Sequence, residues 1–371
     1  MSLGARYNIG ALAATRALLA ALDGGSSTRC VLAFMGDSWA HGDSYWLRQF
    51  TKTLQTKYGF GGIGYVGFQW FGATSGTWVD GGSQPSGGGA GCSRGDLVAA
   101  PVFNGAWTSA NSGVNSPSIG NAYTTAENAY VRFGFPAGHT GADLYYGGDG
   151  TGIIDYSWDD GSNWSSPLAL EAAVPSLIAL ENVPSGAASL RLRRVSGRFE
   201  PHGVNMKSTA SGVVVHKIAA SGSNTTMWSA VDLDVWAAQV DSLSPDMLAC
   251  ILGTNDQSGS LAAATFGANV ANVMGAIATQ NADIERLWIG PAENTRDSAV
   301  TMAAYNAAAK AVATSQGFAH YDLAVLFGPN PAEYAFGTDL GLLDATNLHP
   351  ATARGGVLIS NAIERLLAPV H

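Results

Sequence analysis

The chain has 371 residues and a formal net charge of −9, and this length favours two domains over one. Only 13% of the residues are charged and 46% are apolar, with 47 glycines, which indicates a well-packed globular protein rich in turns rather than a disordered chain. The negative charge argues against a nucleic acid or an anionic membrane surface as partner, because both need clustered Lys and Arg.

The first 23 residues differ from a signal peptide, because their basic start is weak and polar residues interrupt the apolar run. No apolar stretch of the sequence reaches the length that spans a bilayer. We therefore predict a short amphipathic helix at the start of a soluble protein.

The first predicted strand covers Cys30 to Met35, a continuous apolar run typical of a strand buried on both faces. Gly36-Asp37-Ser38 closes it. Residues Asp43 to Tyr58 then show helical spacing, with apolar residues on one face and lysines off it.

From about residue 72 to 211 the pattern changes to short alternating runs separated by Gly, Ser, Asn and Pro. The segment from Asp159 to Asn163 predicts a hairpin turn between two of these runs. Regularly spaced short strands without a helical period favour a β-sandwich. The predicted strands include Tyr130 to Phe135, Ala142 to Tyr146, Ile153 to Trp158, Ser176 to Leu180 and Ser189 to Val195.

A continuous apolar run, like the one from Cys30 to Met35, begins again at Val213 and predicts a strand that ends before Ser221-Gly222. Three strand-then-helix units follow, which indicates a parallel sheet with helical crossovers. We predict an α/β fold with a doubly wound, flavodoxin-like parallel sheet over residues 1–72 and 212–371, interrupted by a β-sandwich insertion over 73–211. The predicted strands are Met247 to Leu252, Arg286 to Ile289 and Phe318 to Leu323, and the helices are Leu261 to Ala278, Ser298 to Ser315 and Ala351 to Leu367.

The three cysteines cannot form a complete disulfide set, and no spacing of Cys or His is typical of a metal site, so we expect no metal. Cys30 and Cys250 lie in apolar runs, and we expect them to be buried free thiols. Cys92 lies in a Gly-Ser loop and is the candidate for an exposed thiol.

Four small polar groups follow apolar runs: Ser38, Gly222, Asn255 and His349. Open α/β sheets place their active sites at the edge where the strands end. A hydroxyl, a backbone amide, a carboxamide and an imidazole together suffice for acyl transfer, because they supply a nucleophile, oxyanion donors and a base.

Three of these residues also have a structural alternative. Ser38 could cap a helix, Gly222 could belong to an ordinary loop, and Asn255 could form a turn. We expect Asp256 to be a turn former that accepts local backbone amides. As an oxyanion donor, Gly222 would need a close approach that a side chain obstructs.

The ordered set Gly-Asp-Ser, Ser-Gly, Gly-Thr-Asn-Asp and His-Pro resembles the SGNH (GDSL-type) hydrolase superfamily. The segment from Phe60 to Val66, with a β module before the Ser-Gly block, resembles the branch that contains bacterial peptidoglycan O-acetylesterases, which carry a carbohydrate-binding-like insertion there. The resemblance implies Ser38 as nucleophile, His349 as base, and Ser38, Gly222 and Asn255 as the oxyanion hole, with no metal or organic cofactor.

The catalytic acid departs from the family pattern. The usual acid stands three residues before the histidine, where this chain has Thr346, and Asp344 stands five before. A local bulge would bring Asp344 to the distal ring nitrogen of His349; otherwise the pair works as a dyad oriented by a backbone carbonyl. We favour Asp344.

The expected function is a serine esterase that removes O-acetyl groups from a carbohydrate, such as peptidoglycan or another polysaccharide, through an acetyl-serine intermediate. The expected partner is therefore an acetylated glycan. Aromatic residues of the insertion are candidates for sugar stacking, or else for the sandwich core: Trp107, Tyr145, Tyr146, Trp158 and Trp164. The alternatives are a lipase or thioesterase of the same superfamily and a noncatalytic glycan-binding structural protein.

Overall fold

A six-stranded sheet forms the centre of the protein in the computed structural model, which describes residues 5–42, 45–68, 77–78, 93–98, 101–110, 115–171, 176–296 and 298–368. Five strands are parallel, and their spatial order, 2-1-3-4-5 along the chain, is the predicted flavodoxin-like order. In that spatial order they are β15 (Gly212–Lys217), β2 (Arg29–Gly36), β16 (Met247–Ile251), β17 (Glu285–Gly290) and β18 (Ala319–Asp322), and β1 (Arg6–Tyr7) adds an antiparallel edge.

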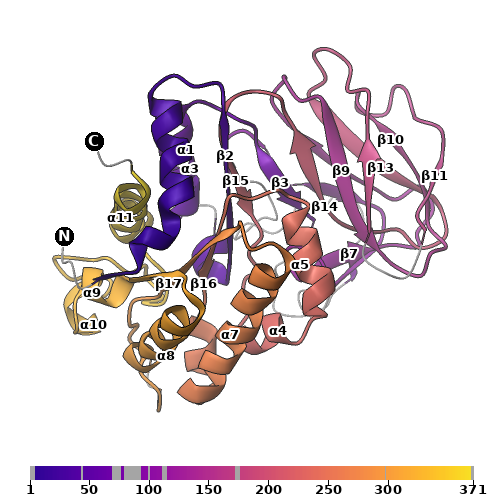
Figure 1. Ribbon diagram of the computed structural model, residues 1–371. Helices are drawn as coiled ribbons and strands as arrows, with labels where there is room; N and C mark the ends of the chain where they lie inside the picture. Colours follow the sequence, from indigo (N-terminus) through magenta and orange to yellow (C-terminus); the bar gives the residue numbers. More distant parts are fainter. Residues whose placement is uncertain are drawn as a thin grey trace.

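Helices cover both faces of this sheet (Figure 1). One face packs against α1 (Ala13–Asp23), α3 (Leu47–Tyr58) and α11 (Val357–Leu367). The other packs against α4 (Thr225–Ser229), α5 (Leu233–Asp241), α7 (Ala263–Gln280) and α8 (Met302–Gln316). Because the strands are buried on both sides, each reads as a continuous apolar run in the sequence.

Short helices gather after the strands: α2 (Ser38–His41), α6 (Thr254–Ser258), α9 (Leu323–Phe327) and α10 (Pro331–Tyr334). A short 3₁₀ turn, Ile9–Leu12, precedes the predicted N-terminal helix, which begins only at Ala13. The helix predicted over 43–58 begins at Leu47, and the one predicted over 351–367 opens with a π-helical turn, Thr352–Gly356. Helices α4 and α5 lie in a segment for which no helix was predicted.

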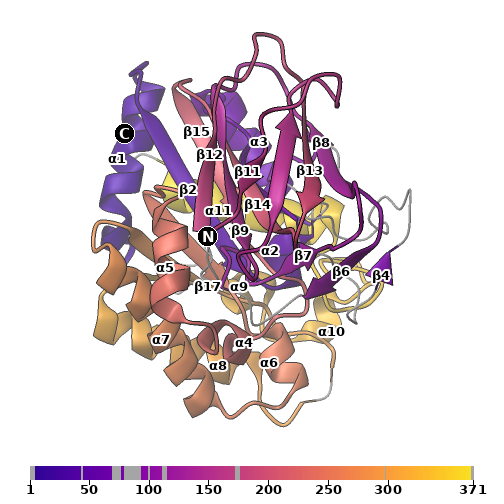
Figure 2. The same ribbon diagram turned by 90° about the vertical axis from the view of Figure 1, so that its right-hand side faces the viewer.

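The inserted β-rich segment folds into antiparallel sheets (Figures 1 and 2). Two of them, in the orders β11-β10-β13-β8-β5 and β12-β9-β14-β3, enclose a common apolar core and form the expected sandwich. A third small sheet has the order β4-β6-β7.

The strands of the first sandwich sheet are β5 (Val102–Asn104), β8 (Tyr130–Gly134), β10 (Ile153–Ser157), β11 (Leu168–Ala169) and β13 (Ser189–Ser196). Those of the second are β3 (Gly64–Gly67), β9 (Gly141–Gly147), β12 (Ser176–Leu180) and β14 (Glu200–Lys207), and those of the third are β4 (Thr77–Trp78), β6 (Trp107–Ala110) and β7 (Asn121–Tyr123).

Buried tyrosines join the sandwich to the parallel sheet. Strand β3 lies before residue 73, the predicted start of the insertion, yet it pairs with β14 of the sandwich. The Tyr65 amide donates to His216 Nδ1 on β15 at 3.0 Å, and the Tyr145 hydroxyl lies 2.8 Å from Ser242 Oγ. The two tyrosine rings meet edge to face at 5.6 Å, so the sandwich is packed against the edge of the parallel sheet.

Cys30 and Cys250 are buried free thiols in β2 and β16, as predicted. Cys92 lies outside the described residues. Within the described ranges, no helix combines the length and the apolar composition that a bilayer crossing requires.

Candidate active site

Ser38 lies at the carboxyl end of β2, as the first residue of α2. The cap of this short helix is Asp37, whose Oδ1 accepts the Trp39 amide at 2.9 Å. The alternative in which Ser38 serves as the cap is therefore wrong, and its hydroxyl is available for other contacts.

Gly36 is required immediately before this motif. A Cβ at Gly36 would overlap the carbonyl oxygen of Ile251 on the neighbouring strand β16, so no other residue fits without moving the backbone. The Asp37 amide donates to the same Ile251 oxygen at 3.2 Å. The two strands that carry Ser38 and Asn255 toward this edge are thus fixed to each other.

His349 reaches Ser38 from the other end of the chain. Its Nε2 lies 2.8 Å from Ser38 Oγ, although 311 residues separate them in sequence. An imidazole nitrogen at this distance can accept the hydroxyl proton, which is the geometry of an activated serine nucleophile.

Gly222 and Asn255 are tied to the same edge through Ser223. The Gly36 oxygen accepts hydrogen bonds from the Ala220 amide at 2.8 Å and from Ser223 Oγ at 3.3 Å, which fixes the Gly222 loop beside β2. Asn255 Nδ2 donates to the Ser223 oxygen at 2.9 Å. The structure therefore brings the predicted oxyanion donors to the strand end that carries Ser38.

Gly222 has a φ of 76°, which favours glycine, and a Cβ there would meet no protein atom within 4 Å. That a side chain at this position would obstruct an oxyanion stays a prediction. One expectation about these loops needs correction. Asp256 was expected to bond local amides. It instead accepts the Thr225 amide at 3.0 Å and the Thr225 hydroxyl at 2.5 Å, and so holds α4 against α6.

Asp344 stands at the distal side of His349. Its Oδ2 lies 3.4 Å from His349 Nδ1, which is ion-pair distance but longer than a well-formed hydrogen bond. Its Oδ1 accepts the Thr346 amide at 3.0 Å and the Thr346 hydroxyl at 2.5 Å. The residue at the family's usual acid position thus supports the carboxylate that approaches the histidine.

A tight loop makes this contact possible across five residues. The Asp344 amide donates to the His349 oxygen at 2.8 Å, so the backbone closes on itself between them. Asn347 adopts a left-handed φ of 54°, and its Oδ1 accepts the Phe336 amide at 2.6 Å. The left-handed residue provides the bulge that the sequence required for Asp344 to reach His349.

Burial and nearby charges set the protonation of the site. Burial lowers the pKa of His349, the Asp344 carboxylate opposes this, and the Arg296 guanidinium lowers the pKa further. Burial alone would raise the pKa of Asp344, but hydrogen bonds from Thr346 and the charge of His349 hold it below its usual value. Burial raises the pKa of Asp37 to about 8 against the hydrogen bond from the Trp39 amide, and Asp256 adds to the rise.

The remaining described histidines lie away from Ser38 or are buried in structural roles. His216 on β15 accepts the Tyr65 amide, and burial lowers its pKa to about 4. His41 ends α2 and is fully buried, and burial lowers its pKa. Across the described part of the chain, no three His, Cys, Asp or Glu side chains are grouped so that they could hold a metal ion.

Part of the chain resembles a known family of proteins. The model of the GDSL-like Lipase/Acylhydrolase family matches residues 189–353. This span contains Gly222, Asn255, Asp344 and His349, and Ser38 lies before it because the sandwich separates the first strand from the rest. No curated protein sequence matches the chain.

Among solved structures, one described as a peptidoglycan O-acetylesterase superposes with a TM-score of 0.71 at 16% identity and covers 95% of both chains. A salicylyl-acyltransferase from a tetracycline biosynthetic pathway gives 0.32 at 14% identity, over 68% of this chain and 82% of that chain. A family two carbohydrate esterase from Cellvibrio japonicus gives 0.30 at 11% identity, over 72% and 98%. The protein has the SGNH hydrolase fold with an inserted sandwich and resembles GDSL-like acylhydrolases.

If Asp344 orients His349, the Asp344→Asn variant should lower kcat on a small ester by at least about a hundredfold, because the amide favours the wrong tautomer. The matched control is Asp339→Asn, an exposed aspartate in the same loop. Steady-state kinetics of both variants distinguish a triad with Asp344 from a Ser-His dyad. Equal and mild losses of kcat in the two variants would indicate the dyad.

Arg296 should set part of the pH dependence. The side chain is exposed and holds its guanidinium near His349 by donating to Ser258 Oγ. Removing this charge relieves repulsion of the imidazolium and raises the pKa of His349, so Arg296→Gln should move the acidic limb of kcat/KM to higher pH. Arg365→Gln on α11 removes the same formal charge elsewhere and should leave the limb unchanged. A shift to lower pH in Arg296→Gln would contradict this assignment.

Proposed function

We propose that this protein is a serine esterase that removes O-acetyl groups from a carbohydrate. The observation that carries the proposal is the 2.8 Å contact between Ser38 Oγ and His349 Nε2, at the sheet edge that also bears Gly222 and Asn255. An SGNH hydrolase fold provides the setting in which this pair acts as nucleophile and base.

In the proposed reaction, Ser38 Oγ attacks the acetyl carbonyl carbon while its proton passes to His349 Nε2. The oxyanion is stabilised by the Ser38 and Gly222 amides and by the Asn255 carboxamide. The bond between the carbonyl carbon and the sugar oxygen then breaks, and His349 returns the proton to that oxygen. Water, deprotonated by His349, attacks the acetyl-serine and releases acetate and free Ser38. Asp344 stabilises the imidazolium in both steps.

A cavity near Arg296, whose charge acts on His349, is lined largely by polar residues. This cavity of about 410 Å³ opens after β16 and β17, beside the helix that carries Asn255. Its walls are mostly amides, hydroxyls and charged groups: Gln257, Glu293, Asn294, Thr295, Arg296, Ser298 and Thr301, with Pro331. This lining supports a sugar ester over the lipase or thioesterase alternative.

We propose that the insertion over 73–211 is a module that contacts the glycan. Three of the five candidate aromatic residues, Trp107, Tyr145 and Tyr146, are at most 5% exposed, so they belong to the core. Trp158 is 8% exposed and also packs in this core, and together with Trp164 it lines a cavity of about 280 Å³ on the sandwich.

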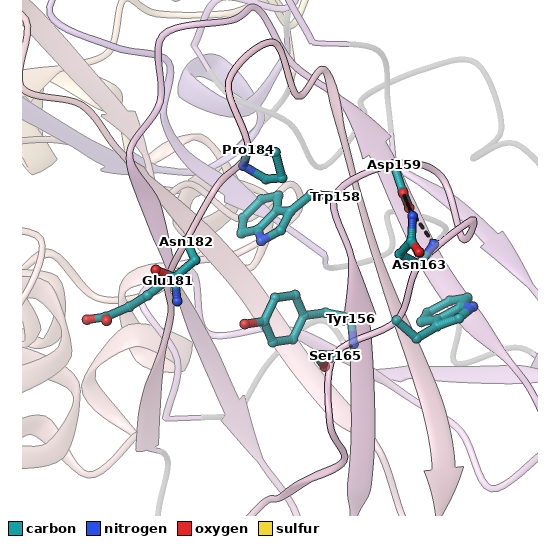
Figure 3. A pocket seen from close by; sticks show the side chains of 9 residues that line it. Tyr156, Trp158, Asp159, Asn163, Ser165, Glu181, Asn182 and Pro184 are labelled. Carbon is teal, nitrogen blue, oxygen red and sulfur yellow. Dashed lines mark hydrogen bonds between the residues drawn. The ribbon is translucent and has the colours of Figure 1, made fainter.

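This sandwich cavity combines aromatic and polar walls. Figure 3 shows Trp158 and Tyr156 one above the other, with Glu181 and Asn182 on one side and Asn163 on the other. A pyranose ring presents C–H groups on its faces and hydroxyls around its rim, so it matches apolar rings bordered by amides and carboxylates. The Arg193 guanidinium lies 3.7 Å from the centre of the Trp164 ring and holds that side chain in place.

The Ser38→Ala variant should lose ester hydrolysis while remaining folded, because the attacking oxygen is removed and the oxyanion donors cannot replace it. Two measurements test the proposal. Acetate release from acetylated peptidoglycan, xylan and other polysaccharides tests the carbohydrate substrate, and a nitrophenyl ester series from acetyl to octanoyl tests the preference for acetyl groups. Preference for octanoyl would favour the lipase alternative. Hydrolysis that does not depend on Ser38 would refute the mechanism, and a folded protein with no turnover would favour the structural alternative.

Replacing Trp164 with Ala should reduce activity on polymeric acetylated glycan by roughly tenfold and leave nitrophenyl acetate hydrolysis unchanged, because only the polymer spans both modules. The control Leu177→Ala removes an exposed apolar side chain of β12, outside the cavity. Equal polymer activity in the Trp164→Ala variant and the unmodified protein would exclude this cavity from glycan binding.

A further inference from the structure

Tyr45 lies against the proposed base although no sequence motif points to it. Its ring is stacked on the imidazole of His349, with ring centres 4.8 Å apart and planes only 14° from parallel. Tyr45 belongs to the connection between α2 and α3, so the segment that follows the Ser38 helix covers one face of the histidine.

Two glycines hold Tyr45 in this place. A Cβ at Gly42, the residue that ends α2, would overlap the Cδ2 and Cε2 atoms of the Tyr45 ring. A Cβ at Gly356, in the π-helical turn that follows His349, would overlap the Tyr45 carbonyl oxygen. The ring is therefore wedged between the end of the serine helix and the imidazole, while its backbone packs on the segment after the histidine.

We propose that Tyr45 is a positioning residue that sets the plane of His349 toward Ser38 and stabilises its protonated form during the reaction. This inference rests on the proposed esterase mechanism. Asp344 Oδ2 lies 3.4 Å from His349 Nδ1, which is longer than a well-formed hydrogen bond, so this carboxylate by itself holds the ring only loosely. The stacked phenol ring supplies the missing constraint.

The chemistry of the stack fits a transient cation. An aromatic face attracts positive charge, and His349 becomes an imidazolium when it takes the proton of Ser38. Burial, with the nearby Asp344 charge, raises the pKa of the Tyr45 phenol to about 12, so the ring is neutral whenever the base is active. Among the described residues, the charged groups that act on His349 are Asp344, which favours the imidazolium, and Arg296, which opposes it.

The decisive comparison is Tyr45→Phe against Tyr45→Leu, measured on nitrophenyl acetate. The Phe variant keeps the aromatic face, so kcat should stay within about twofold. The Leu variant fills similar space without that face, so kcat should fall about tenfold with KM unchanged. The acidic limb of kcat/KM should also move to lower pH in the Leu variant, because the imidazolium loses its stabilising face.

The Gly42→Ala variant provides an independent test that keeps the aromatic ring. Gly42 has a φ of −61°, which alanine adopts freely, and the nearest atoms that its Cβ would meet among the described residues belong to the Tyr45 ring. Gly42→Ala should lower kcat in the unmodified protein and have little further effect in Tyr45→Ala, which is the non-additivity expected of two residues acting through one contact.

The outcomes separate the two proposals. If Ser38→Ala abolishes turnover but the Leu variant matches the Phe variant in kcat and pH profile, only the role of Tyr45 fails. If turnover does not depend on Ser38, the esterase mechanism fails. Thermal melting of each variant distinguishes loss of kcat in a folded protein from unfolding, and additive losses for Gly42→Ala and Tyr45→Ala would also overturn the inference.

Discussion

The close approach of β2 and β16 at Gly36 is the constraint on which the candidate site depends. No side chain fits at Gly36, because a Cβ would overlap the Ile251 oxygen, and the Gly36 carbonyl receives both the Ala220 amide and the Ser223 hydroxyl. Gly36 therefore fixes the ends of β2, β16 and β15 relative to one another. Ser38 follows it by two residues, and the loops that carry Gly222 and Asn255 are held by bonds around the same point.

The polar groups at this edge divide into those that hold the loops and those available for chemistry. Asp37 and Asp256 are buried carboxylates used to cap α2 and to hold α4, and burial raises the pKa of both. Ser38 and His349 are only partly buried and face each other. A buried carboxylate is costly unless it is hydrogen-bonded or protonated. We therefore infer that Asp37 and Asp256 serve to make this edge of the sheet rigid.

The sandwich is attached to the parallel sheet by buried tyrosines and a paired strand, and not by the residues of the candidate active site. Tyr65 and Tyr145 bury their rings between the two parts and direct their polar atoms to His202, His216 and Ser242. Strand β3 follows α3 directly and enters the sandwich sheet, so the chain crosses between the two parts on a paired strand. A connection of this kind holds the proposed glycan module in a defined position relative to Ser38.

The sequence by itself determined the parallel strands and the residues Ser38, Gly222 and Asn255 that follow three of them, because strands buried on both faces read as continuous apolar runs closed by small polar groups. It also placed the short alternating strands of the sandwich. Helices α4 and α5 did not show in the periodicity, because they are short and are anchored by the buried Trp228 and Trp236. The sequence favoured Asp344 as the acid but left a dyad open, and only the tertiary structure showed Asp344 beside His349 and Tyr45 over the imidazole. The first contact depends on the left-handed conformation of a local loop, and the second joins segments about 300 residues apart, so local sequence pattern encodes neither.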